Sequence, residues 1–216
     1  MVIFQPERFL LKKQIEKFAS HIKGEVLDVG AGERKRYAEF FGQAKKYLTM
    51  DINPENNPDI VGRAEKIPLG DDSVDSIVCT QVLGDVFKLG RAIKEFSRVL
   101  RRNGILLLTE SLAGEMHDEP HDYWRFTKFS LKKLLERNNF KIIAVDQRGG
   151  FFSTVAQIKI RYLLDRWHLY DHKIIGRIFN YFFLFYGRGM IMLDGLDSSR
   201  ANRKHALGWC VVAKKL

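Results

Sequence analysis

The feature that most constrains this chain of 216 residues is an apolar segment that runs directly into a pair of glycines. The segment, EVLDVGAGE, covers residues 25–33 and contains Gly30 and Gly32. A second apolar segment ends at Asp51, 19 residues after Gly32. Glycines let the backbone turn tightly and approach a ligand, and an acid at the tip of the next strand can accept hydrogen bonds from both ribose hydroxyls. This layout predicts a site for a cofactor that contains adenosine.

The residues after the second glycine indicate which adenosine cofactor the loop suits. A dinucleotide fingerprint needs a third glycine, at the position that Lys35 occupies here. Pyrophosphate also favours a helix N-terminus without acids, whereas Glu33 stands there. A cofactor without phosphate tolerates Glu33, and a sulfonium cation is compatible with nearby carboxylates. The sequence therefore favours S-adenosylmethionine over NAD.

An ordered series of segments from about Val26 to Leu108 resembles the class I S-adenosylmethionine-dependent methyltransferases. The matching segments are VLDVGAG (26–32), Asp51-Ile52, AEKIP (64–68), DSVDSIVC (72–79), TQVL (80–83) and RVLRRNG (98–104). The resemblance implies an α/β, Rossmann-like fold with a seven-stranded, mostly parallel sheet, helices on both faces and an antiparallel final strand. It also implies that the cofactor lies across the carboxyl ends of the first four strands.

The sequence departs from that family pattern at two places. Arg34 replaces the third glycine of the usual GxGxG loop, a change that resembles the GAG-x-R-type loops of related methyltransferases. Gly84-Asp85 stand where many relatives carry Glu-His. The second departure removes a candidate catalytic histidine, so the mechanism cannot be carried over whole.

Hydrophobic periodicity predicts strands that alternate with helices, which is typical of a parallel α/β sheet. The predicted helices cover 8–18, about 34–42, 88–101, and a segment from a Ser130 cap to about 137; the predicted strands cover 25–29, 46–51, 58–61, 75–79, 104–109, 141–145 and 209–213. We expect residues 1–216 to form a single methyltransferase domain. Residues 151–206 are then a helical cap inserted before the last strand.

The cofactor residues are expected at the ends of these strands. Gly30 and Gly32 are expected to contact the cofactor, Asp51 to bind the ribose, and Asp28 to hold the glycine loop or a bridging water. Tyr37 is compatible with the methionine end of the cofactor and equally with a helix core. The full predicted set is Asp28, Gly30, Ala31, Gly32, Asp51, Ile52, Ala64, Glu65, Thr80 and Gln81.

A polar loop, His117 to Thr127, follows the strand at 104–109 and is expected at the carboxyl edge of the sheet, where open α/β folds bind ligands. His121 is the candidate general base for a hydroxyl or amine nucleophile. Asp122 is then expected to orient it, and Arg125 to clamp a phosphate or carboxylate. The predicted substrate residues are His117, Tyr123 and Trp124.

Other interpretations of this loop stay open. It resembles the PHDYWR-[YF]-T signature of a methyltransferase subgroup associated with glycan or cell-surface biosynthesis. His121 is also compatible with a structural role, and Arg125 with a simple ion pair to Asp122 or with a helix end. No metal site is predicted, because Pro120 prevents the helix that would place His117 and His121 on one face.

Composition bounds the class of protein. A chain of this length with 45% hydrophobic residues can bury one substantial core. Cys79 and Cys210 lie in apolar segments, which predicts buried thiols rather than a disulfide or a zinc pair. The opening residues carry no long apolar stretch, which favours a cytoplasmic protein.

The net charge of +10 is concentrated towards the carboxyl end. Residues 150–216 carry 11 Lys or Arg against 4 Asp or Glu, and residues 151–186 hold 11 of the 26 aromatic residues. A basic, aromatic segment indicates an anionic partner: a phosphate-bearing substrate, nucleic acid or a membrane surface.

Within this segment, apolar side chains recur at helical spacing: Ile175, Ile178, Phe179, Phe182, Phe183 and Tyr186. The longest run without charge is ten residues, 178–187, far short of the roughly 20 that span a bilayer. A cap helix over the active site is the favoured interpretation. The alternative is peripheral contact of residues 173–193 with the inner face of a membrane.

The resemblance implies in-line methyl transfer from S-adenosylmethionine to a small or glycan- or lipid-linked acceptor, at a hydroxyl or an amine. One alternative is methylation of RNA, such as tRNA, which the basic charge suggests. The chain lacks paired catalytic cysteines and an Asn-Pro-Pro-Tyr-type loop, so nucleic acid is not favoured. The second alternative is a non-catalytic module that only binds S-adenosylmethionine. The oligomeric state is not determined by the sequence.

Overall fold

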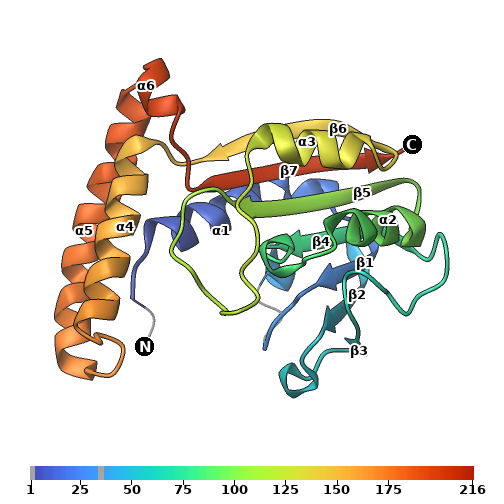
Figure 1. The fold of residues 1–216 in the computed structure, drawn as a ribbon, viewed down its shortest axis with the longest axis horizontal. Coiled ribbons are helices and arrows are strands. Elements are labelled where there is room, and N and C mark those ends of the chain that lie inside the picture. Colours follow the sequence, from blue (N-terminus) through green and yellow to red (C-terminus); the bar gives the residue numbers. More distant parts are fainter. Residues whose placement is uncertain (1–2, 34–36) are drawn as a thin grey trace.

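The computed structural model describes residues 3–33 and 37–216 (Figure 1). Its strands form one sheet in the order β3-β2-β1-β4-β5-β7-β6. Neighbouring strands are parallel except that β7 runs antiparallel to β5 and β6. The predicted Rossmann-like, mostly parallel sheet of seven strands is therefore confirmed. The strands are β1 (Gly24–Val29), β2 (Ala44–Asp51), β3 (Ile60–Val61), β4 (Val74–Thr80), β5 (Leu100–Ser111), β6 (Phe140–Arg148) and β7 (Gly208–Lys215).

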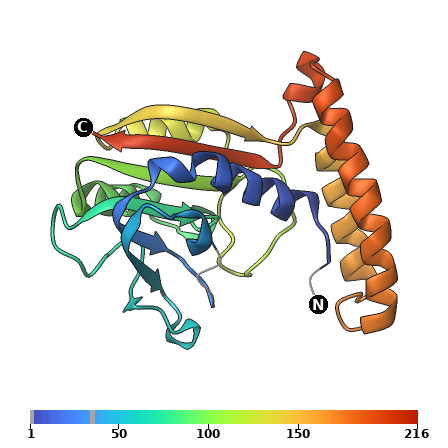
Figure 2. The same ribbon diagram turned by 180° about the vertical axis from the view of Figure 1, so that it is seen from behind.

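Helices cover both faces of the sheet (Figures 1 and 2). On one face α1 packs Ile15 and Phe18 against strand residues such as Val26. On the other face α2 and α3 pack around Leu27 and its neighbours. The alternation arises because successive strand residues point to opposite faces. The helices are α1 (Pro6–Phe18), α2 (Leu89–Val99), α3 (Lys128–Glu136), α4 (Phe151–Arg166), α5 (Lys173–Leu196) and α6 (Arg200–Arg203).

One predicted helix and one predicted helix cap were wrong. The helix expected over about 34–42 is a single 3₁₀ turn, Ala38–Phe40, within the described residues. The predictions about Arg34 and Lys35 fall outside the described residues. Helix α3 begins at a Thr127 cap rather than at Ser130. The Thr127 hydroxyl accepts the Ser130 N–H and the Ser130 hydroxyl accepts the Thr127 N–H, which satisfies two donors that a helix start leaves unpaired.

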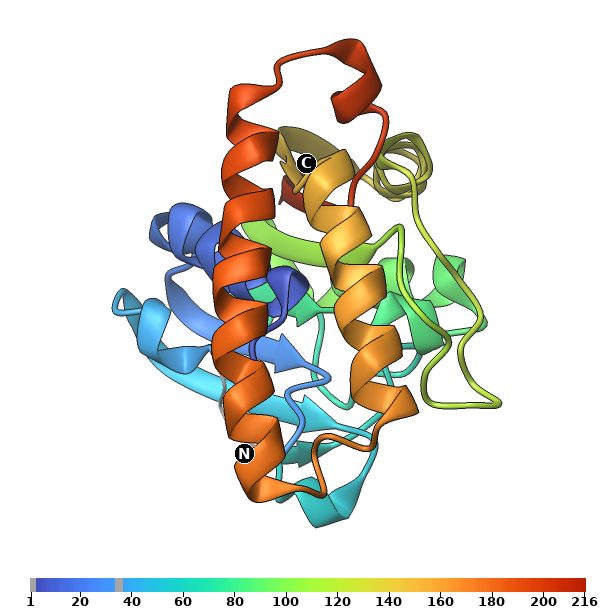
Figure 3. The same cartoon turned by 90° about the vertical axis from the view of Figure 1, so that its left-hand side faces the viewer.

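Residues 151–206 form the helices α4, α5 and α6 between β6 and β7. The arrowheads of β1, β2 and β4 point towards the α4–α5 pair, so this hairpin stands at the carboxyl ends of the parallel strands (Figures 1 and 3). It has a small core of its own, in which Phe183 of α5 meets Ile160 and Leu164 of α4. None of the helices in the described residues is both long and apolar enough to cross a membrane.

The two cysteines lie on interior strands. Cys79 of β4 and Cys210 of β7 are free and buried, as predicted. Burial raises the pKa of the Cys210 thiol to about 12. Both residues are therefore packing groups of the core rather than reactive thiols.

Candidate active site

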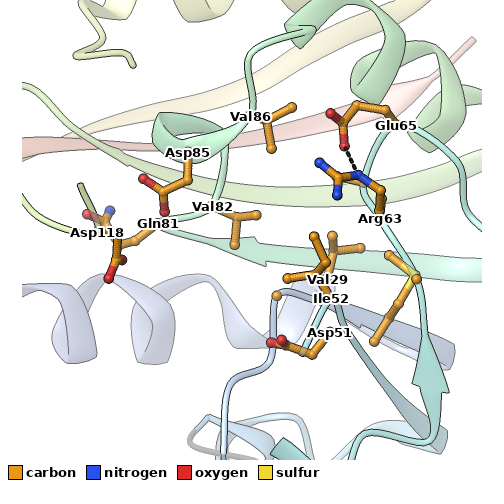
Figure 4. Close-up of a pocket in the computed structure, with 14 residues that line it drawn as sticks. Val29, Asp51, Ile52, Arg63, Glu65, Gln81, Val82, Asp85, Val86 and Asp118 are labelled. Carbon is orange, nitrogen blue, oxygen red and sulfur yellow. Dashed lines mark ion pairs between the residues drawn. The ribbon is translucent and has the colours of Figure 1, made fainter. Parts of the chain in front are cut away.

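Two adjoining cavities open at the carboxyl ends of β1, β2 and β4, and both are lined by Gly30 and Gln81. The first, about 350 Å³, is called the apolar cavity because Val29, Ile52, Ala64 and other apolar side chains dominate its wall. Figure 4 shows Asp51 on one side of it and Asp85 and Asp118 on another. The second, about 420 Å³, is called the polar cavity; its lining includes Asp28, Ala31, Gly32, Thr80, His117 and Arg161.

The glycine loop requires its glycines. Gly30 and Gly32 both have positive φ, 71° and 66°, a conformation that side chains disfavour. A Cβ on Gly30 would lie 2.3 Å from Val82 Cγ2, whereas one on Gly32 would meet nothing within 4 Å. The backbone of Gly32 therefore faces open space at the polar cavity, as the close approach of a ligand requires.

Asp51 fixes the shape of this loop. It is buried, and its Oδ2 accepts the Gly32 N–H at 2.9 Å while its Oδ1 accepts the Asn53 N–H at 2.9 Å. A carboxylate has about four acceptor sites, so two remain for ribose hydroxyls. Binding of the ribose by Asp51 stays a prediction.

Asp28 does not hold the glycine loop, contrary to one of the two sequence-based expectations for it. Its Oδ2 accepts the Tyr47 hydroxyl at 2.7 Å, while the Gly30 and Ala31 N–H groups donate to Met50 O. Burial raises the pKa of the Asp28 carboxyl to about 7, with a further contribution from the charge of Asp51. Asp28 still lines the polar cavity, where its oxygens remain available to a bound polar group.

The remaining predicted cofactor residues divide between the cavities. Ile52, Ala64 and Glu65 line the apolar cavity, with Glu65 3.8 Å from Arg63 in an ion pair (Figure 4). Thr80 lines the polar cavity, and its buried Oγ1 has no hydrogen-bond partner among the residues that the structure describes. A buried hydroxyl without a hydrogen-bond partner lowers the stability of the fold unless a ligand or a water molecule bonds to it. Together with the open space at Gly32, it fits a cofactor whose polar end enters the polar cavity.

The polar cavity is bordered by a buried charge network that the sequence did not predict. Arg148, at the end of β6, is fully buried and donates to Glu7 Oε1 at 3.1 Å and to Gln14 Oε1 at 3.0 Å. The Ser111 hydroxyl also donates to Glu7, at 2.9 Å. Gln81 joins the network through Ser111, with its amide 2.7 Å from that hydroxyl. The only sign of this network in the sequence was Arg148 itself, a charged residue that follows the predicted strand 141–145.

A second buried carboxyl, Glu110 on β5, supports the segment after β4. Its Oε1 accepts the Leu83 N–H at 2.8 Å and the Val82 N–H at 3.3 Å. Burial raises the pKa of Glu110 to about 8. The carbonyl of Gly84 in turn accepts the N–H groups of Tyr123 and Trp124, at 2.9 and 3.0 Å. The Gly84-Asp85 departure from the family pattern is therefore the place where the loop 117–127 docks.

This burial gives a testable pH dependence. The folded-state pKa of Glu110 lies above its ordinary value of about 4.5, so its contribution to stability is fully present below about pH 4.5 and is lost as the pH rises to about 8. Glu110→Gln keeps an acceptor for the Leu83 N–H and cannot ionise. We expect the stability of the variant relative to wild type to increase by on the order of 2 kcal/mol between pH 6 and pH 8. Denaturant melts at the two pH values measure this; parallel pH profiles would contradict it.

The loop 117–127 brings a different histidine to the cavities from the one expected. His117 lines the polar cavity, and its Nδ1 lies 3.7 Å from Asp85 Oδ1 and 3.5 Å from Asp118 Oδ2. His121 is exposed, its Nδ1 lies 2.9 Å from the Tyr123 hydroxyl, and it is not among the residues that line the two cavities. Ligand atoms of Asp85, His117 and Asp118 lie within 4.8 Å of one another.

Asp122 does not orient His121, which corrects the sequence-based expectation. Its two oxygens pair with the two terminal nitrogens of Arg125, and Oδ2 also accepts the His117 N–H at 3.1 Å. The Arg125 guanidinium holds the pKa of Asp122 at about 2. Arg125 thus forms the ion pair with Asp122 that was the alternative to a substrate clamp. This pair joins two residues of the loop 117–127 to each other.

Tyr123 and Trp124 make contacts within the protein. The Tyr123 ring lies edge-on to Phe87, with 5.3 Å between ring centroids. The Trp124 indole donates to Val86 O at 3.1 Å. Both rings are about 40% exposed, and neither is in the lining of the two cavities, so their contacts anchor the loop beside Val86.

Comparison with known proteins agrees with this geometry. Residues 27–108 match a family model described as a methyltransferase domain. An uncharacterised protein of Methanocaldococcus jannaschii is 26% identical over 62% of this chain and 71% of its own length. The uncharacterised methyltransferase YcgJ of Bacillus subtilis is 29% identical over 49% of this chain and 47% of its own length. A methyltransferase structure from Archaeoglobus fulgidus superposes with a TM-score of 0.60 at 13% identity, covering 96% of this chain and 94% of that one.

The matched segment runs from β1 into β5 and contains most of the strand ends that border both cavities. Residues 27–108 therefore carry a methyltransferase domain, and the chain has the fold of the S-adenosylmethionine-dependent methyltransferases. Its cofactor is S-adenosylmethionine, and its activity is methyl transfer.

Proposed function

We propose that the chain methylates a hydroxyl or amine of a small or glycan- or lipid-linked acceptor that enters the polar cavity. The observation that carries this proposal is the adjoining pair of cavities, of which only the polar one is bordered by His117 and Arg161. The apolar cavity suits an adenine ring, with Asp51 at the ribose; Thr80 and the Gly32 backbone suit the amino-acid end. When bound, S-adenosylmethionine supplies a methyl group already activated by the sulfonium, so the protein mainly aligns the acceptor.

The charges around the polar cavity support an acceptor that carries an anionic group. Arg8 of α1 and Arg161 of α4 line the cavity from two helices. Arg161 is also ion-paired with Glu115, which lies two residues before His117, so α4 contacts the segment that leads into the loop 117–127. A phosphate or carboxylate on the acceptor suits such a guanidinium. Arg125, which the sequence suggested for this role, already has Asp122 as its partner.

Two groups of the loop are candidates for accepting the proton of a hydroxyl or ammonium. His117 is favoured because it borders the cavity, with its Nδ1 near carboxylate oxygens of Asp85 and Asp118. His121, with Asp122 and Arg125, is the original sequence-based proposal and requires the loop to move towards the cavity. We treat residues 1–216 as one domain in which 151–206 caps the polar cavity, because Arg161 reaches the cavity from α4.

RNA methylation and cofactor binding without turnover remain the competing functions. The test is incubation with methyl-labelled S-adenosylmethionine and a cell extract separated into lipid, RNA, polysaccharide and small metabolites. Label in the lipid, polysaccharide or metabolite fraction is the expected result. Label in RNA alone would replace the proposed acceptor class, and binding of the cofactor with no transfer to any fraction would favour the non-catalytic function.

A further inference from the structure

Helix α5 carries apolar side chains on two opposite faces. Its inner face is covered: Gly176, Phe183 and Gly187 are buried, with Phe183 against α4 and Gly187 beside the N-terminal segment. Its outer face carries a stripe of apolar side chains, each of which is more than half exposed. The stripe consists of Ile174, Ile178, Tyr181, Phe182, Phe185, Met192 and Leu196. Spacings of three or four residues keep these side chains in line along the helix. A helix that is apolar on both sides is normally covered on both sides.

The outer stripe faces away from the body of the molecule. Figure 3 shows the α4–α5 hairpin in front of the sheet, with the other described elements behind it. Phe185 is 76% exposed and Ile178 64% exposed, values that belong to an uncovered surface. Apolar patches of this extent mark interaction sites rather than ordinary surface.

The charge of α5 is of one sign up to Leu193; its one acid, Asp194, accepts the N–H groups of Gly150 and Phe152 at the start of α4. Residues 173–193 contain Lys173, Arg177 and Arg188 and no Asp or Glu. Arg177 and Arg188 are exposed and are offset to the same side of the stripe at helical spacing. An apolar stripe flanked by cations, without acids, is the pattern of a helix that lies in the plane of an anionic membrane.

We propose that the outer face of α5 binds the surface of an anionic lipid bilayer. The apolar stripe would enter the boundary between head groups and acyl chains, and the flanking cations would meet lipid phosphates. The helix lies on the bilayer rather than across it, since no helix of the described residues is apolar enough to span. Exposed Tyr181 and Trp167 add rings that favour the interface.

A second copy of the chain is the competing occupant of this face. A two-fold interface brings the same patch of both copies together. A patch with cations and no acids would then meet only cations, which opposes close approach. An anionic bilayer supplies the missing negative charge, so the charge pattern favours lipid over self-association.

Membrane binding would also place the polar cavity beside the bilayer. Arg161 of α4 lines that cavity, and Tyr170, in the turn between α4 and α5, accepts a hydrogen bond from Gln5 Nε2 at 2.6 Å. Gln5 lines the cavity as well. A lipid-linked acceptor would therefore reach the site from the membrane; this consequence rests on the proposed function, whereas the membrane binding itself does not.

The experiment is co-sedimentation of the whole chain with two kinds of vesicle: phosphatidylcholine alone, and phosphatidylcholine with about a third phosphatidylglycerol. We expect about tenfold or tighter binding to the anionic vesicles, weakened by salt. Phe185→Glu should abolish it, and Ile178→Gln should weaken it. The matched control is Phe129→Glu, which replaces a phenylalanine of α3 that is 71% exposed and should leave binding unchanged.

A second comparison tests whether binding depends on the cations of α5 or only on the net positive charge of the protein. Arg177→Gln with Arg188→Gln should weaken binding, whereas Lys45→Gln with Lys46→Gln, an equal loss of charge at exposed positions of β2, should not. The proposal would be overturned if wild type bound neither kind of vesicle, or if Phe185→Glu bound the anionic vesicles as tightly as wild type does. A dimer by light scattering that Phe185→Glu dissociates while vesicles are not bound would also overturn it. None of these readouts needs methyl transfer, so their failure leaves the proposed function intact.

Discussion

His117→Ala is expected to lower turnover about 10²–10⁴-fold while the affinity for S-adenosylmethionine hardly changes. The imidazole borders the polar cavity, and its Nδ1 lies within 3.7 Å of carboxylate oxygens of Asp85 and Asp118. His117 is not in the lining of the apolar cavity, so the adenosine contacts are expected to survive. The measurements are steady-state kinetics on the acceptor found by the labelling screen and calorimetry of the cofactor.

The matched control is His121→Ala, a change of the same kind four residues later in the same loop. His121 contacts Tyr123 rather than either cavity, so its loss is expected to change turnover by less than about tenfold. A large loss in His121→Ala with normal turnover in His117→Ala would restore the sequence-based assignment. Turnover that EDTA abolishes in wild type would instead indicate that Asp85, His117 and Asp118 act by holding a cation.

Glu7→Ala is expected to reduce the free energy of unfolding by about 3–5 kcal/mol. Glu7 is the carboxylate partner of Arg148, whose side chain has no exposed surface. Removing Glu7 leaves a buried guanidinium without a counter-charge and the Ser111 hydroxyl without its acceptor. The lower end of the range is expected, because the Glu7 side chain is 17% exposed and water can partly replace it. Urea unfolding at neutral pH provides the measurement.

Two further variants make this result specific. Glu7→Gln keeps an acceptor for Ser111 and should fall between wild type and Glu7→Ala. Glu16→Ala removes an exposed carboxylate from the same helix and should change stability by less than about 0.5 kcal/mol. If Glu7→Ala and Glu16→Ala were equally mild, the Glu7–Arg148 pair would not be a major stabilising contact.

The sequence predicted the part of the fold that depends on local patterns. The strands around VLDVGAG and the segment ending at Asp51 were correct because apolar runs followed by glycine or acid identify strand ends. The same landmarks gave part of the lining of the apolar cavity, such as Asp51, Ile52 and Ala64. Of the helix expected near 34–42, the described residues 37–42 form only the turn Ala38–Phe40, since Phe41 is buried and β2 begins at Ala44.

The sequence could not predict contacts between distant segments. Glu7 and Arg148 are 141 residues apart and meet only because α1 packs beside the end of β6. The support of residues 82–83 by Glu110 likewise depends on the register of β4 against β5. Within the loop, composition indicated a reactive segment but not which side chain turns inward. Docking on Gly84 decides that His117, rather than His121, reaches the polar cavity.

The most direct test of the central claim is calorimetric titration of wild type and Asp51→Ala with S-adenosylmethionine, its demethylated product and NAD. Asp51 borders the apolar cavity and holds the Gly32 N–H, so its loss removes the ribose acceptor and loosens the glycine loop. Wild type should bind the first two ligands and not NAD, and Asp51→Ala should bind them about 1–3 kcal/mol more weakly. Asp171→Ala, at an exposed acid that lines neither cavity, should behave as wild type. Tight binding of NAD, or unchanged cofactor affinity in Asp51→Ala, would contradict the account.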